Sequence, residues 1–101
     1  MEEYKLRILP PAQIDILDIV EHLNTLSSEA AAHNYDQLIG QIFGLASAPE
    51  RYPLARDTQL RLRGYRALVH NGYIVLFVIK PETVEIRRVL YTKRQYEWLF
   101  S

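Results

Sequence analysis

The basic residues of this chain gather in its second half, where tyrosines and arginines stand at spacings that could support chemistry. Residues 51–101 contain ten basic and four acidic residues (net +6), whereas residues 1–50 contain two basic and eight acidic residues (net −6). Clustered cations suit phosphate groups or an acidic partner. The alternative is a set of solvated charges that pair within the fold. The basic residues are Arg51, Arg56, Arg61, Arg63, Arg66, Lys80, Arg87, Arg88, Lys93 and Arg94.

Other kinds of site are excluded by what the sequence lacks. With no cysteine among its 101 residues, the chain has no disulfide, zinc–thiolate site, iron–sulfur cluster or cysteine nucleophile. It contains no phosphate loop, metal motif or nucleotide fingerprint, so we expect neither a metal nor another cofactor. The longest apolar run, Tyr73 to Ile79, is far shorter than the roughly 20 residues that cross a bilayer. We expect a single cytoplasmic domain over residues 1–101 with no membrane partner.

The first half of the chain predicts one strand followed by two helices. Residues 4–9 alternate polar and apolar side chains, as a half-buried strand does. Apolar residues then recur at helical spacing over 12–26 and again over 29–47. Because almost nothing separates these two segments, they should form an antiparallel helical hairpin.

The second half predicts three strands after a proline-rich loop at 48–53. The strands are expected at 59–70, 73–80 and 84–91, with Gly64 as a bend or bulge in the first. Asn71-Gly72 is a strong hairpin signal, since both central residues of a type I′ turn need positive φ. Thr92 would cap a short C-terminal helix carrying Tyr96, Trp98, Leu99 and Phe100.

These elements predict an α+β fold with the order β-α-α-β-β-β. The helical hairpin should cover one face of a small, mostly antiparallel four-stranded sheet, with 73–80 as its central strand. The first strand should lie beside the last. The opposite face should carry the outward residues of the strands, many of them arginine.

Several segments of the chain resemble the RelE/ParE toxin superfamily. The similar segments are Tyr4 to Ile8, Ala48 to Pro53, Leu62 to Arg66 and Ile86 to Tyr96, together with the helical hairpin. The resemblance implies a toxin of a bacterial type II toxin–antitoxin pair. RelE-like members cut messenger RNA on the ribosome, whereas ParE-like members poison DNA gyrase and are not nucleases. Ribosome-dependent cleavage is our first hypothesis and gyrase poisoning the alternative.

The resemblance also implies site residues for a metal-independent endoribonuclease. Arg66 stands where RelE-like toxins carry a phosphate-stabilising arginine, and the last strand and tail supply the second cationic group. The catalytic candidates are Arg66, Arg88, Lys93, Arg94, Tyr91 and Tyr96, and the RNA-binding candidates are Arg61, Arg63 and Arg87. The chain departs from the RelE-like pattern before Gly64-Tyr65-Arg66, where lysines are missing. A YoeB-like branch of the superfamily uses a glutamate with a C-terminal histidine and tyrosine, and this chain has no histidine beyond His70.

If the protein cuts RNA, the catalytic cations should converge on one concave surface opposite the helices, with a tyrosine at its edge. If it poisons gyrase, it should act through its surface and its C-terminal tail. Both hypotheses imply a cognate antitoxin and a toxin–antitoxin hetero-oligomer. An acidic antitoxin segment should run toward the arginine-rich half.

Overall fold

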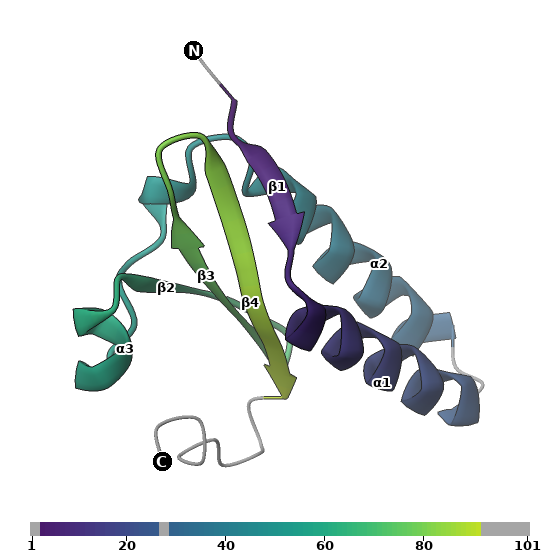
Figure 1. Cartoon of the computed structure of the whole chain (residues 1–101). Coiled ribbons are helices and arrows are strands. Elements are labelled where there is room, and N and C mark those ends of the chain that lie inside the picture. Colours follow the sequence, from purple (N-terminus) through teal and green to yellow (C-terminus); the bar gives the residue numbers. More distant parts are fainter. Residues whose placement is uncertain (1–2, 27–28, 92–101) are drawn as a thin grey trace.

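The computed structural model describes residues 3–26 and 29–91 and contains one four-stranded sheet flanked by helices (Figure 1). The predicted order of a strand, two helices and three strands is confirmed. The elements are β1 (Lys5–Ile8), α1 (Pro10–Leu26), α2 (Glu29–Gly44), the 3-10 helix η1 (Pro49–Arg51), α3 (Thr58–Leu62), β2 (Tyr65–His70), β3 (Tyr73–Ile79) and β4 (Thr83–Tyr91). The C-terminal helix predicted from Thr92 lies outside the described residues.

The sheet has the strand order β1-β4-β3-β2, so the first strand lies beside the last, as predicted. β1 runs parallel to β4, and the other pairs are antiparallel. The β2–β3 hairpin turns at Asn71-Gly72, where φ is 43° and 89°. Both residues therefore adopt the left-handed conformation that the sequence predicts for this turn.

One face of the sheet is closed by the helical hairpin. Leu38 and Ile42 of α2 pack with Leu68, Val75 and Phe77 in a core whose members are almost completely buried. These strand residues alternate with residues that point to the opposite face, because successive side chains of a strand point to opposite sides.

The opposite face carries a second, smaller core, which corrects the prediction of a largely arginine-bearing surface. Leu76 and Leu90 of the sheet are buried against Leu60 of α3 and Ala55 of the preceding loop. The strand predicted over 59–70 is therefore wrong in its first part, since 58–62 form the helix that covers this face.

Local capping explains why α3 forms. The Asp57 side chain accepts a hydrogen bond from the Leu60 N–H at 3.1 Å, which satisfies an N-terminal donor of the helix. Gly64, with φ at 81°, then follows the last turn of α3 and directs the chain into β2. It is thus a helix-ending residue and not a bulge within a strand.

The bulge in the sheet lies in β4. Leu76 pairs with Arg88, but the adjacent Phe77 pairs with Ile86, so Arg87 is an extra residue. A bulge shifts the alternation of side chains along its strand. It therefore decides which way the arginines of β4 point.

Candidate functional site

Arg66 lies in β2 and points to the side of the sheet that carries the helical hairpin. It pairs with Phe77, which belongs to the core on that side. Its Nη1 donates to the main-chain carbonyl of Tyr52 at 2.6 Å and to that of Glu50 at 3.3 Å. Arg66 thus anchors the η1 loop to the sheet by satisfying two carbonyl groups.

Arg88 makes the most extensive ion pair among the described residues. Its Nε and Nη2 donate to the two carboxylate oxygens of Asp15 in α1, at 2.7 and 2.9 Å. Asp15 Oδ2 also accepts the main-chain N–H of Val89 at 2.9 Å. The hydrogen bonds that Arg88 donates to Asp15 raise the pKa of Arg88.

The Asp15 carboxylate binds the end of β4 at an edge where no neighbouring strand is present in the described sheet. β1 ends at Ile8, opposite Ile86, so the last part of β4 has no neighbour on that edge. Asp15 occupies the edge there and bonds both main chain and side chain of β4. This pair is therefore a structural clamp between α1 and β4, and it holds the Arg88 guanidinium in place.

Arg87 points to the face opposite the helical hairpin. Its Nη2 lies 2.7 Å from Glu85 Oε1, and its guanidinium carbon lies 5.7 Å from the centre of the Tyr65 ring. Arg7 of β1 approaches the other oxygen of Glu85 at 3.9 Å. Two arginines therefore interact with one carboxylate, and this cluster of Arg7, Glu85 and Arg87 has a net positive charge.

The predicted convergence of the arginines on one surface opposite the helices is wrong for the described residues. Arg66 binds loop carbonyls on the helix side, Arg88 is turned toward α1, and Arg87 lies on the other face. Strand alternation separates Arg66 from Arg87, and Asp15 draws Arg88 to the sheet edge.

Arg61 and Arg63 were expected on a strand but lie at α3. Arg61 is in its last turn and Arg63 is its C-terminal cap, and both side chains are exposed. They remain available to a partner, although on a different element from the one predicted.

Tyr91 ends β4 and is 36% exposed. Its ring packs edge-on against Tyr73, with ring centres 5.1 Å apart. Burial, followed by the proximity of Tyr91, raises the pKa of Tyr73. Lys93, Arg94 and Tyr96, the other predicted catalytic residues of the tail, lie outside the described residues.

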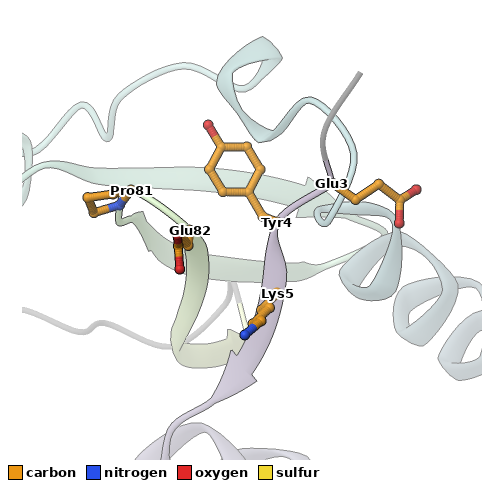
Figure 2. A pocket seen from close by; sticks show the side chains of 5 residues that line it. All are labelled: Glu3, Tyr4, Lys5, Pro81 and Glu82. Carbon is orange, nitrogen blue, oxygen red and sulfur yellow. The ribbon is translucent and has the colours of Figure 1, made fainter.

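A hollow of about 520 Å³ lies where β1 begins beside the β3–β4 turn (Figure 2). Its side chains point in several directions and carry mixed charges, as Figure 2 shows. Tyr4 donates a hydrogen bond to Glu50, which raises the pKa of Tyr4 and lowers that of Glu50. These side chains do not converge on one point, as the groups of a reaction site would. The hollow is a gap between the start of β1 and the β3–β4 turn.

Asp15 and Glu50 are the important polar residues that the sequence analysis missed. Asp15 has the spacing of an ordinary acidic residue near a helix N-terminus, and its partner lies 73 positions away. The sequence places Glu50 in the proline-rich loop at 48–53 and does not indicate its hydrogen bond with Tyr4. No signal in the sequence joins either residue to its partner.

The described part of the chain, residues 3–26 and 29–91, contains no cluster of three or more His, Asp or Glu side chains suited to a metal ion. Within the same residues, no helix has the length and apolar character needed to cross a membrane.

Two solved structures have folds similar to that of this chain over most of its length. A chain of the chromosomal ParDE toxin–antitoxin system from P. aeruginosa superposes with a TM-score of 0.73 at 18% identity, over 90% of this chain and 98% of that one. A chain of the RelBE2 toxin–antitoxin complex from Mycobacterium tuberculosis gives 0.65 at 22% identity, over 90% and 93%. A search of curated proteins found no significant match. The model of the family described as "ParE toxin of type II toxin-antitoxin system, parDE" matches residues 6–96. With nearly its whole length matched, the chain belongs to the ParE toxin family of type II toxin–antitoxin systems.

Proposed function

We propose that this ParE-family toxin acts by binding and poisoning DNA gyrase, and does not cleave RNA. The observation that carries the proposal is the placement of the arginines of β2 and β4. Arg66, Arg87 and Arg88 each have a partner within the fold and point in different directions. Metal-free cleavage of RNA needs a base, an acid and cations around one phosphate. The family match supports the same choice.

Ribosome-dependent cleavage of messenger RNA is the second candidate. It is favoured by the exposure of Tyr91 at the end of β4, directly before a stretch that contains Lys93, Arg94 and Tyr96. A site made from these residues would act without Arg66 and Arg88. The two candidates therefore differ in the product that appears in cells.

An antitoxin encoded with this chain is the expected partner under either candidate. The similar structures from P. aeruginosa and M. tuberculosis both come from toxin–antitoxin systems, which supports a hetero-oligomer here as well.

The decisive experiment induces the chain alone and examines DNA and RNA from the same cells. Gyrase poisoning should yield linear plasmid DNA trapped with gyrase, while the ends of messenger RNA match those of uninduced cells. New messenger RNA ends inside coding regions, with intact plasmid, would refute the proposal and support cleavage.

Two variants refine this test. Arg66→Gln removes the cation but keeps a donor for the η1 carbonyls, so a binding toxin should remain toxic. Loss of a cation that stabilises a transition state would instead reduce cleavage roughly a hundredfold. Deletion of Trp98 to Ser101 should abolish toxicity if the tail contacts gyrase. Thermal unfolding of both variants must match the parent chain for these results to count.

A further inference from the structure

The outer edge of β2 is only half covered by the chain itself. The segment 53–55 runs antiparallel to β2, with Leu54 bridged to Arg66. The Ala55 N–H donates to the Tyr65 carbonyl at 2.8 Å, and the Ala67 N–H donates to the Pro53 carbonyl at 3.3 Å. This short segment therefore acts as a fifth strand along the first part of β2.

The pairing stops at Pro53. Proline has no N–H, so it cannot return a hydrogen bond to the Ala67 carbonyl. The Ala67 carbonyl therefore points away from β3 without a partner from Pro53. Because main-chain groups alternate in direction along a strand, the N–H and C=O of Val69 also point away from β3. Within residues 3–26 and 29–91, these three main-chain groups have no hydrogen-bond partner in the protein. Val69 itself is 65% exposed.

The opposite edge of the sheet differs. The Tyr4 N–H donates to the Ala46 carbonyl, and the Ile8 carbonyl accepts from the Gln13 side chain at 2.8 Å. Both ends of β1 are therefore occupied by the protein's own groups. The open segment of β2 is the better place for another strand.

A hollow lies on each side of this open edge. On the helix side, a polar hollow of about 610 Å³ is lined by residues that include Gln37, Arg51 and His70. On the other side, a hollow of about 380 Å³ is lined mainly by apolar residues, among them Leu54 and Ile74. Val69 and Ala67 belong to the second lining and His70 to the first, as the alternation of β2 requires.

Arg51 gives the polar hollow a positive charge. Its guanidinium stacks over the Tyr52 ring, with the carbon 5.2 Å from the ring centre. Among the described residues no carboxylate lies within ion-pair distance of Arg51, and it is the one charged residue in that lining. An acidic side chain entering this hollow would meet an unpaired cation.

We propose that the open edge of β2 at 67–70 binds an extended peptide segment of a partner protein in which acidic and apolar residues alternate. The peptide pairs with the Ala67 and Val69 main chain, directs its acidic side chains toward Arg51 and places its apolar side chains against Val69 and Ile74. Main-chain bonds supply affinity, and the two different hollows supply specificity. This inference does not depend on which target the toxin attacks.

The test uses a synthetic ten-residue peptide of alternating glutamate and valine, capped at both ends, with the full chain. Titration calorimetry should detect binding, and the amide of Val69 should become protected from hydrogen exchange. A peptide of alternating lysine and valine should bind at least tenfold more weakly, because its cations would face Arg51. Equal binding of the two peptides, or protection at Leu6 in place of Val69, would overturn the proposal.

Variants separate the contributions. Val69→Pro removes the outward N–H and should weaken binding roughly tenfold, whereas Val69→Thr keeps the N–H and the shape and should bind nearly normally. Arg51→Gln should weaken binding several-fold, and the charge-matched control Lys80→Gln should not. If Val69→Pro fails to fold, the exchange of the Val69 amide in the parent chain decides the question. Binding of a single-stranded RNA at this edge in place of the peptide would also refute the inference.

Discussion

The two faces of the sheet are closed by covers of very different size. On one face, α1 and α2 bury Leu68, Val75 and Phe77 completely. On the other, the five-residue α3 and the loop before it cover only part of the surface, and Val69 remains largely exposed.

The difference explains the unusual sequence of β3. Residues 73–79 are apolar on both sides because both faces of this central strand are covered. The large cover provides most of the buried apolar area, and the small one leaves an edge and a hollow accessible. Stability and surface recognition are thus expected to depend on different faces of the same strands.

The largest effect should come from Phe77→Asp on the well-covered face. An unpaired carboxylate at a fully buried position costs on the order of 5 kcal/mol or more, which is comparable to the total stability of a small domain. The chain should fail to unfold cooperatively in urea. Val69→Asp, on the exposed side, should change the free energy of unfolding by only about 1 kcal/mol. A stably folded Phe77→Asp variant would contradict the arrangement of the two faces.

Asp15→Asn should have the next largest effect, because it leaves Arg88 without its carboxylate at the edge between the faces. Breaking a mostly buried ion pair from one side should cost about 3 kcal/mol. Asp18→Asn, at an exposed position of the same helix, should cost less than about 0.5 kcal/mol. Urea denaturation of both variants measures the difference, and equal stabilities would show that the clamp is not stabilising.

Leu60→Ala measures the contribution of the small cover. Leu60 is 6% exposed in a cluster of few residues, so its truncation should cost about 2 kcal/mol, at the lower end for a core leucine. Leu62→Ala, two positions later and 80% exposed, should be close to neutral. A loss with Leu60→Ala as large as that with Phe77→Asp would indicate that the two faces are equally important.

The smallest effect is expected for Tyr4→Phe, which removes the hydrogen bond to Glu50. The pKa of Glu50 should rise toward its ordinary value, as a carboxylate titration by NMR would show. A carboxylate whose pKa is lower in the folded than in the unfolded state stabilises the fold at pH values above the unfolded pKa. This stabilisation is lost as the pH falls through the folded pKa. Tyr4→Phe should therefore weaken the pH dependence of stability in the acid range, whereas Tyr35→Phe should not. An unchanged Glu50 pKa would contradict the role of this bond.

Much of the fold could be predicted from the sequence because its signals are local. Asn71-Gly72 predicted the hairpin, and helical spacing predicted α1 and α2. The short helix α3 was mistaken for a strand because Leu60 and Leu62 alternate with polar residues. A five-residue helix is too short for its period to be distinguished from that of a strand. Asp57 as a cap and Gly64 after the last turn were the signals that could have identified it.

The arrangement of the site was less predictable, because it depends on register and on distant contacts. The bulge at Arg87 and the pairing of Arg66 with Phe77 determine which face each arginine occupies. The bond between Asp15 and Arg88 joins residues 73 positions apart, and nothing in either local sequence marks it.

The position of β1 also affects how the protein can fold as it is made. β1 is synthesised before the other described strands, yet within the described sheet it pairs only with β4, the last of them. Contacts between such distant residues slow folding, because a long loop must close before they form. At a synthesis rate of about 5–20 residues per second, β1 waits several seconds for its partner. The parallel pairing of β1 with β4 therefore delays completion of the sheet until β4 has been synthesised.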